Sequence, residues 1–419
     1  MNKPKIPFWI AVLINANIVI GSAFFLGAPK IAAMSGLLAP LAWLMCGALL
    51  LPLVLVFSKL AKIYPTEGGI YVYSRHCLGA FWGFCSGWGY FIGTVAGNAA
   101  VIHVFSKKFQ AIGSVQQFFT SKGISSGLWF DVVLVVLFTF FNLMNIEFLE
   151  RAQIFFAVMK AIPFILIIVA APLLFDTHDF FATSFDVSGL FDSIPLVLFA
   201  YIGIEACCAI ADKIEDNKGS RAILWSFGII MSVYTLLQLM LLFIQTDKGA
   251  DPFMTILPRL ISNPMIINWG NGIIYLAILS SFLGGFYGMF YYNNWNLYAI
   301  AKERNILWSS HLIKLNKNYT PWVCVLAQSA LVIGLLVFVK KGSYLITIGD
   351  FGVMVAYLLS VLAFLTIKRS ATALCALVSC FLLIGICTNN LLAAGWWYIV
   401  PFLGTMVLGI IFYLLQHRD

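Results

Sequence analysis

Apolar runs about as long as a lipid bilayer is thick recur along the whole chain. A helix that crosses the hydrocarbon core needs roughly 20 apolar residues. In this sequence 62% of the residues are hydrophobic and only 10% are charged, far from the balance of a soluble domain. Helices satisfy their own backbone polar groups in lipid, so the pattern predicts an all-α integral membrane protein.

The runs divide the chain into about twelve spans joined by short loops. The first run is too long for the core of a signal peptide and has no small-residue cleavage site, so it is expected to stay in the mature protein. Residues 1–419 are expected to form one transmembrane domain without a separate soluble part. The predicted spans are residues 8–34, 38–60, 79–105, 128–147, 152–174, 190–212, 221–245, 267–300, 321–339, 344–367, 371–388 and 394–415.

Positive charge is unevenly shared between the two sides that these spans define. An even number of spans puts both termini on one side, and the loops of that side carry more Lys and Arg, as in segments 59–75, 213–221 and 302–317. The positive-inside rule then predicts cytoplasmic termini in a cell membrane. The net charge of +8 mainly reflects this asymmetry, so no nucleic-acid partner is expected.

Glycine interrupts two of the runs at mid-membrane depth. Residues 18–27 read Ile-Val-Ile-Gly-Ser-Ala-Phe-Phe-Leu-Gly, and residues 198–205 read Leu-Phe-Ala-Tyr-Ile-Gly-Ile-Glu. Backbone groups freed there must face protein, water or a ligand, and a half-helix N-terminus attracts anions. We therefore predict two opened helices that hold a substrate between them. The alternative is that Gly21 only lets two helices approach closely.

Two interrupted helices five spans apart are the sequence sign of an inverted repeat with a site near the midplane. We pair residues of about 8–174 with residues of about 190–367 as two five-span repeats. The two extra helices within 371–415 have no polar midpoints, so we assign them to scaffold or homodimer contact.

A resemblance to a known family rests on three segments. Residues 65–71 read Pro-Thr-Glu-Gly-Gly-Ile-Tyr, and residues 199–205 contain Phe-x-x-x-Gly-x-Glu. Together with the glycine-rich first span, they resemble the amino acid–polyamine–organocation superfamily of secondary transporters. The resemblance implies a LeuT-like fold with discontinuous helices 1 and 6. Residues 212–222 depart from the family because they lack the two prolines of most relatives, which leaves the subfamily open.

The resemblance also assigns substrate-binding residues. Amides at the first break would bind an α-carboxylate, carbonyls at the second break an α-amine, and two aromatic side chains would occlude the ligand. A Gly-Asn pair in the third span is similar to that of exchangers of basic amino acids for their amines, although it could equally join helices. An aromatic stripe on a buried helix is also more often packing. The predicted residues are Ile20, Gly21, Ser22, Ala23, Asn98, Phe199, Ala200, Tyr201, Gly203 and Tyr291.

Two charged residues inside apolar spans are predicted to couple protons to transport. Such residues are costly and usually face a cavity or a partner. In many superfamily members a lysine at the place of Lys160 stands in for a coupling sodium, and the helix-6 carboxylate, here Glu205, is often linked to protons. An ammonium would repel sodium, which disfavours sodium coupling. The alternatives are that Lys160 snorkels to the cytoplasmic edge and that Glu205 only accepts backbone hydrogen bonds.

Other classes of function find less support. The five His are scattered and the nine Cys form no CxxC pair, so we expect no metal and no cofactor. Neither a P-loop nor a Gly-x-Ser-x-Gly motif occurs, which disfavours ATP-driven transport and hydrolysis. The leading prediction is a proton-coupled secondary active amino acid transporter that works by alternating access around a midplane site. The alternatives are an exchanger of a basic amino acid for its amine or polyamine and, more distantly, a channel or a transporter-like sensor.

Overall fold

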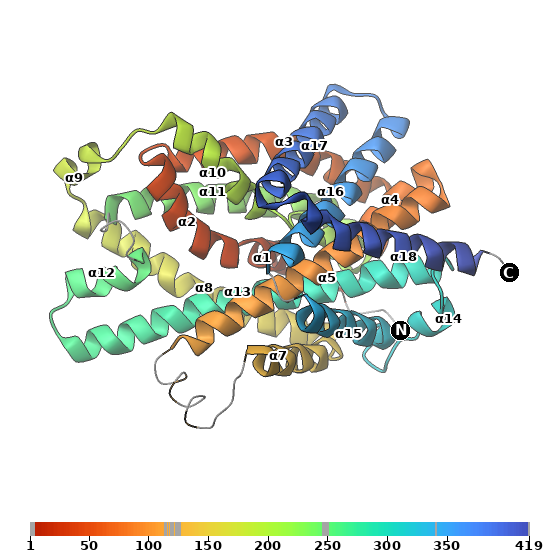
Figure 1. Ribbon diagram of the computed structural model, residues 1–419, viewed down its shortest axis with the longest axis horizontal. Coiled ribbons are helices and arrows are strands. Elements are labelled where there is room, and N and C mark those ends of the chain that lie inside the picture. Colours follow the sequence, from red (N-terminus) through yellow and green to blue (C-terminus); the bar gives the residue numbers. More distant parts are fainter. Residues whose placement is uncertain are drawn as a thin grey trace.

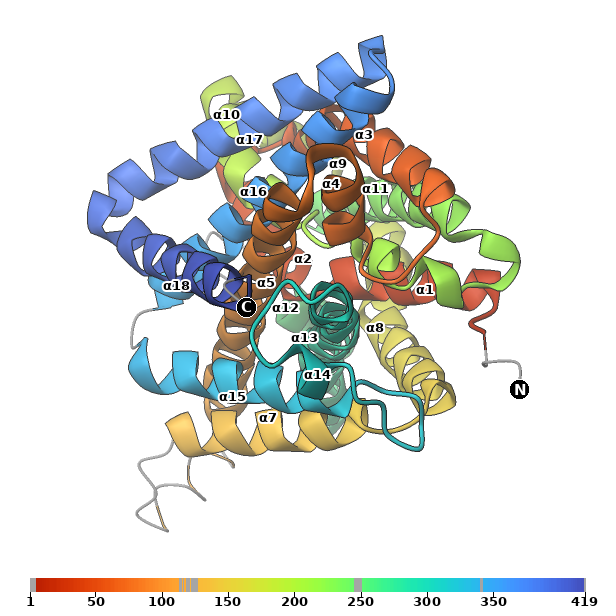
Figure 2. The ribbon, with the colours of Figure 1, turned by 90° about the vertical axis from the view of Figure 1, so that its right-hand side faces the viewer.

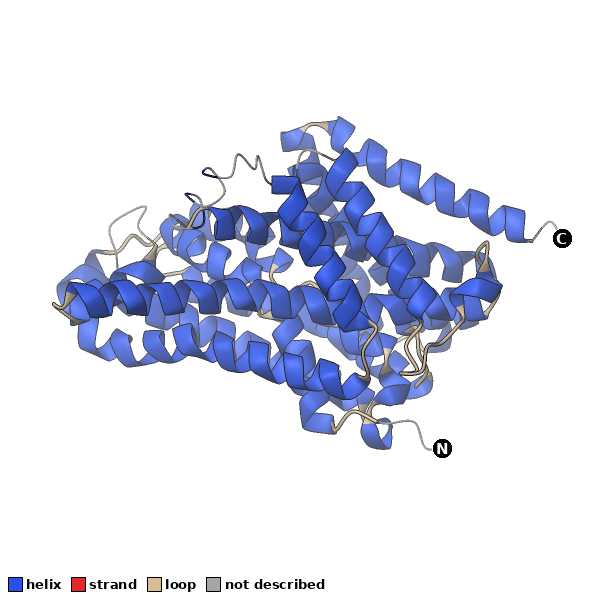
Figure 3. Cartoon of the chain, turned by 90° about the horizontal axis from the view of Figure 1, so that it is seen from below, coloured by secondary structure: helices blue, strands red, loops and turns tan. Residues whose placement is uncertain are grey.

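The computed structural model describes residues 5–112, 115, 117, 121, 127–244, 251–339 and 342–417. Within them the regular structure is helical, and β-pairing is limited to isolated bridges (Figure 3). The α-helices are α1 Phe8–Val19, α2 Ser22–Ser35, α3 Ala39–Ile63, α4 Gly69–Leu78, α5 Ala80–Gln110, α7 Gly127–Asn142, α8 Ile146–Leu174, α9 Thr177–Ala182, α10 Val187–Phe199, α11 Gly219–Ile244, α12 Pro252–Leu260, α13 Pro264–Lys302, α14 Ser309–Leu312, α15 Trp322–Phe338, α16 Gly342–Ile367, α17 Ala371–Ala394 and α18 Val400–Gln416. The 3-10 helices are η1 Ala206–Ala209, η2 Ala211–Lys213, η3 Glu215–Asn217 and η4 Trp396–Ile399.

Among the described residues, eight helices are long and apolar enough to cross a membrane, and the bent pair of α1 and α2 makes a ninth. Three further apolar helices, α7, α10 and α15, are shorter. Figure 1 shows the long helices running mostly lengthwise through the molecule, and α7 lies beside α15 in Figures 1 and 2. These helices confirm the predicted all-helical membrane protein. Helices α4 and α12 fall in segments that the sequence analysis left between spans.

The first predicted span is broken where its glycine lies. Helix α1 ends at Val19 and α2 begins at Ser22, and the two helices meet at an angle of 53°. Gly21 has an extended backbone with φ −128° and ψ −143°, so its carbonyl and the groups around it leave the helical ladder. The opening that the Gly-Ser-Ala sequence predicts is therefore present.

The second interrupted run is also open. Helix α10 ends at Phe199, turns follow, and the chain continues as the short 3-10 helix η1. Gly203 has φ +102°, a region that L side chains rarely adopt, and a Cβ there would lie 2.9 Å from the Met289 Cε atom. Glycine is thus needed at this turn for both backbone and packing reasons.

The two broken segments run antiparallel, so that their breaks come together. At one end, the Ile6 N–H donates to the Lys213 carbonyl over 2.7 Å. At the other end, the Leu37 N–H donates to the Ser184 carbonyl over 3.0 Å. The start of each segment therefore lies beside the end of the other.

Glycines also bring α5 and α16 close together. A Cβ on Gly93 would lie 2.9 Å from the Gly349 carbonyl oxygen, and one on Gly352 would overlap the Gly89 carbonyl oxygen. Small residues let the backbones of membrane helices approach in this way. This contact places one face of each helix at the same wall of the central cavity.

Candidate functional site

A cavity of about 120 Å³ lies at the two helix breaks. It has room for several water molecules or one small solute. Most of its lining is apolar, with a few polar side chains, as is usual for small-molecule sites. Its lining consists of Ile18, Val19, Gly21, Ser22, Ala23, Gly93, Thr94, Gly97, Asn98, Ala100, Val101, Phe199, Ala200, Ile202, Phe282, Gly285, Phe286, Met289, Ile346, Gly349, Asp350 and Val353.

Six of the predicted substrate-binding residues line this cavity. They come from both breaks and from α5, which are far apart in the sequence. The side-chain nitrogen Nδ2 of Asn98 is buried and has no hydrogen-bond partner among the described residues. The six residues are Gly21, Ser22, Ala23, Asn98, Phe199 and Ala200.

The other four predicted residues lie outside the lining of this cavity, as far as the structure describes the chain. Ile20 is buried behind the break, and Gly203 shapes the second turn. Tyr201 points to α3, where its hydroxyl donates to the Trp43 carbonyl over 3.1 Å. Tyr291 lines a separate cavity near the N-terminal end of the chain, together with Trp295. The expectation that Tyr291 covers the same cavity as Phe199 does not match this placement.

The N-terminus of α2 opens toward the cavity. The first amides of a helix have no partner within it, and in α2 no side chain caps them. Ser22 and Ala23, the first two residues of α2, both line the cavity. The positive end of this half-helix is thus available to an anionic group.

Lys160 contacts the other side of the same break, at the C-terminal end of α1. Its ammonium group donates to the Asn17 carbonyl over 2.8 Å and also to the Ile20 carbonyl. These carbonyls belong to the last turn of α1 and to the residue that follows it, where a helix leaves its acceptors unpaired and carries negative partial charge. Lys160 is buried, with 4% exposure, and its ammonium is held at the break, so the structure does not show it snorkelling.

Glu205 lies on the far side of the second break and is held by two hydroxyl groups. Tyr90 of α5 donates to its Oε1 atom over 2.8 Å, and Tyr357 of α16 donates to Oε2. Glu205 is 1% exposed. The carboxylate therefore connects the turn after α10 to the pair of helices that forms the opposite wall of the cavity.

Two polar residues that the sequence analysis did not single out tie the two breaks together. The Tyr234 hydroxyl on α11 lies 2.9 Å from both the Val19 and the Ala200 carbonyl oxygens. Asn15 on α1 donates to the Ile204 carbonyl over 3.0 Å and accepts from the Cys207 N–H. An asparagine inside an apolar run was the available signal for Asn15, because its amide needs partners in lipid.

The segment 65–71 packs at the end of the second broken segment. Gly68, at φ +85°, donates its N–H to the Ala209 carbonyl over 2.9 Å, and a Cβ on Gly69 would lie 2.5 Å from the Cys208 carbonyl oxygen. Glu67 forms a 2.6 Å ion pair with Lys302. Burial alone would raise the pKa of Glu67, but the hydrogen bond and charge of Lys302 lower it below the ordinary value.

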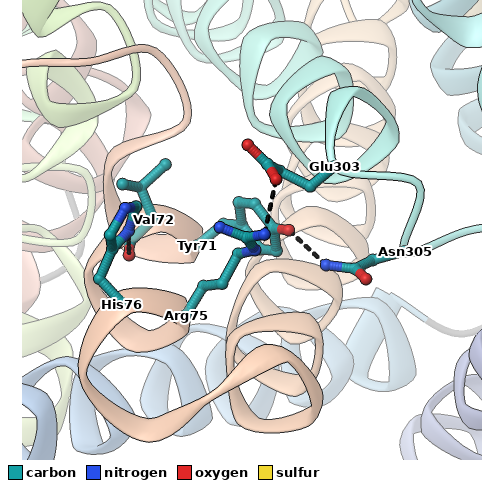
Figure 4. A network of polar contacts seen from close by, with 6 residues as sticks. All are labelled: Tyr71, Val72, Arg75, His76, Glu303 and Asn305. Carbon is teal, nitrogen blue, oxygen red and sulfur yellow. Dashed lines mark hydrogen bonds and ion pairs between the residues drawn. The ribbon is translucent and has the colours of Figure 1, made fainter.

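A second polar network joins α4 to the end of α13 (Figure 4). Arg75 forms a 2.6 Å ion pair with Glu303, and Asn305 donates to the Tyr71 hydroxyl over 2.6 Å. The networks of Glu67 and Arg75 together attach the segment after α3 to the segment after α13.

No group of three or more His, Cys, Asp or Glu side chains suited to a metal ion occurs in the part of the chain that the structure describes. The polar groups at the cavity are instead backbone amides and carbonyls, one amide side chain, two hydroxyls and one carboxylate. Such a set binds a small polar organic solute by hydrogen bonds and charge.

Comparison with known proteins gives a consistent result. The sequence model of the amino acid permease family matches residues 6–416. An arginine/ornithine antiporter of Lactococcus lactis subsp. cremoris is 23% identical, over 67% of this chain and 62% of that protein, so the match spans less than two thirds of its length. Uncharacterized transporters of Mycobacterium bovis and Mycobacterium tuberculosis are each 24% identical, over 92% of this chain and 86% of theirs.

Proposed function

The chain belongs to the amino acid permease family of the amino acid–polyamine–organocation superfamily, and we propose that it is a secondary active amino acid transporter working by alternating access. The observation that carries the proposal is the meeting of two opened helices at one cavity. Broken helices that face each other near the membrane midplane are the usual substrate site of such transporters.

We propose that the substrate's charged ends are divided between the two breaks. The α-carboxylate lies at the free amides of Ser22 and Ala23, at the positive end of α2. The α-ammonium lies at the carbonyl of Ala200, at the negative end of α10. Phe199, which also lines the cavity, covers the ligand.

We also propose the complete topology of about twelve spans, with both termini in the cytoplasm. The shorter helices α7, α10 and α15 overlap three of the predicted spans, which supports this number. The antiparallel pairing of the two broken segments supports an inverted repeat of residues 8–174 and 190–367. In Figure 2, α17 and α18 lie on the upper-left side of the molecule, a position that suits a scaffold or a homodimer contact.

For the energy source we propose proton coupling through Lys160 or Glu205. Lys160 is bound to the carbonyls of Asn17 and Ile20 and therefore holds the last turn of α1 in place. Loss of its proton would remove a positive charge at the break just where the helix must move. In the same way, protonation of Glu205 would weaken its contacts with Tyr90 and Tyr357.

Exchange is the second candidate function. The unpaired amide nitrogen of Asn98 at the cavity favours it, because the Gly-Asn pair is similar to that of basic amino acid exchangers. The relative from Lactococcus lactis is likewise named an antiporter. An exchanger needs a second substrate on the other side of the membrane, whereas a symporter needs a proton gradient.

Uptake assays with the purified protein in proteoliposomes distinguish symport from exchange. Each of the twenty amino acids would be offered with an imposed pH gradient and, separately, with an internal amino acid or amine at constant pH. Uptake driven by the pH gradient supports symport, and uptake that requires the internal substrate supports exchange. Absence of uptake and of binding for every amino acid would overturn the transporter proposal.

A further inference from the structure

The central cavity is lined by an acidic side chain that the sequence analysis did not single out. Ile346, Gly349, Asp350 and Val353 all line it, at spacings of three and four residues. Residues so spaced share one face of a helix, so one face of α16 borders the cavity. Asp350 is the acidic residue of this lining, and it is half-buried.

The carboxylate of Asp350 has no hydrogen bond or ion pair to a side chain or backbone group of the described residues. The other buried charges near the breaks are already engaged: Lys160 with α1 carbonyls and Glu205 with two tyrosines. A carboxylate inside a membrane protein is costly unless a partner compensates it. The cavity is where such a partner has access to Asp350.

The position of Asp350 separates it from the groups at the breaks. Its neighbour Gly349 would, with a Cβ, lie 3.8 Å from the Gly97 Cα atom, so Asp350 belongs to the wall formed by α5 and α16. The free amides of α2 and the carbonyl end of α10 form another part of the cavity. A substrate whose α-groups occupy the breaks therefore presents its side chain to a cavity that contains a carboxylate.

From this geometry we infer that the substrate is an amino acid with a cationic side chain, an ammonium or a guanidinium, which pairs with Asp350. The inference rests on the proposed transport function. A cation compensates the carboxylate, whereas an apolar side chain would leave it without a partner and an acidic one would repel it. Asp350 is thus a specificity-determining residue of the cavity.

The test compares lysine with norleucine, which has a similar side chain without the ammonium. Binding to the purified protein at pH 7 would be measured by calorimetry, with uptake into proteoliposomes as a second readout. Wild type is expected to bind lysine more tightly than norleucine by a factor on the order of ten or more. Asp350→Asn should remove that preference, chiefly by weakening the binding of lysine.

Two control variants complete the design. Asp350→Glu keeps the charge and should retain a preference for lysine. Asp192→Asn makes the same chemical change at an exposed position of α10 outside the cavity lining, and should behave as wild type. Thermal unfolding of each variant reports whether it is folded, and the lysine preference of wild type tests the inference even where a variant does not fold.

The outcomes distinguish this inference from the transport proposal. If wild type binds or transports norleucine as well as lysine, the inference fails and the transporter stands. An unchanged lysine preference in folded Asp350→Asn also overturns it, and a lost pH dependence in that variant would then identify Asp350 as a proton site. If wild type neither binds nor transports any amino acid, the proposed function fails as well.

Discussion

The ammonium nitrogen of Lys160 lies 2.8 Å from the carbonyl oxygen of Asn17. This contact joins α8 to the last turn of α1, more than a hundred residues earlier in the chain. It explains how a helix can end in mid-membrane, since the carbonyls that lose their amide partners gain a charged donor. The same lysine also donates to Ile20, next to the glycine at which the chain opens.

Replacing this lysine should affect both folding and transport. Lys160→Ala leaves the Asn17 and Ile20 carbonyls without their donor, which we expect to lower the free energy of unfolding by about 1–3 kcal/mol. Transport should fall, and any remaining uptake should lose its pH dependence. The matched control is Lys30→Ala, which removes an exposed lysine from α2. A wild-type pH profile in Lys160→Ala would exclude this lysine from the coupling.

The two glycines at the breaks should respond differently to alanine. Gly203 has φ +102° and a close neighbour in Met289, so Gly203→Ala should lower the free energy of unfolding by roughly 1–2 kcal/mol. A Cβ on Gly21 would meet ordinary contacts of 3.6 Å and longer, so Gly21→Ala should change stability much less. Thermal unfolding of both variants in the same detergent checks the difference. Equal losses would contradict the roles given to the two turns.

The Tyr234 hydroxyl should matter for the position of one break relative to the other. It has one hydrogen and lies 2.9 Å from the carbonyls of both Val19 and Ala200. Tyr234→Phe keeps the ring but removes the donor, and we expect an unfolding free energy lower by about 1 kcal/mol together with slower transport. Tyr275→Phe, which removes a hydroxyl outside the cavity lining, is the control. Transport at the wild-type rate in Tyr234→Phe would show that this contact has no part in the cycle.

The ion pair of Glu67 and Lys302 gives a pH dependence with a defined sign. The pKa of Glu67 is lowered in the folded protein: burial acts to raise it, but Lys302 outweighs that effect. A lowered carboxyl pKa adds stability above the ordinary pKa, and this contribution is lost as the pH falls through the folded value. Because Lys302 is exposed, Glu67→Gln should cost at most about 1 kcal/mol at pH 7. The difference between wild type and variant should shrink below about pH 4.5. A difference that grows on acidification would contradict this assignment.

The two breaks could be predicted because glycine and serine in an apolar run have few physical explanations other than an opened or closely packed helix. Six of the predicted substrate residues also line the cavity. The placement of Tyr291 could not be read in the same way. It belongs to α13, a helix of 39 residues rich in aromatic side chains, and only tertiary packing decides which of its faces meets which cavity.

Asp350 is a cavity residue that the sequence analysis did not single out. It is a carboxylate inside the predicted span 344–367, so the rule applied to Lys160 and Glu205 could have marked it, although the helix around it is unbroken. Its position follows from the close contact of α5 and α16, which depends on glycines in both helices. The role of Tyr234 could not be predicted, because a single tyrosine in an apolar helix does not indicate which carbonyls its hydroxyl will contact.

The central claim is that the cavity at the two breaks holds the substrate, and filling that cavity tests it most directly. Gly97 lines the cavity, and a Cβ there would meet open space, so Gly97→Leu should occupy the cavity without disturbing the helices. The control is Gly334→Leu, at a glycine of α15 that also faces open space but lies outside the cavity lining. The decisive measurement is calorimetric binding of the transported amino acid to wild type and both folded variants. We predict wild-type affinity in Gly334→Leu and an affinity lower by a factor on the order of ten or more in Gly97→Leu. Equal affinity in all three proteins would contradict the claim.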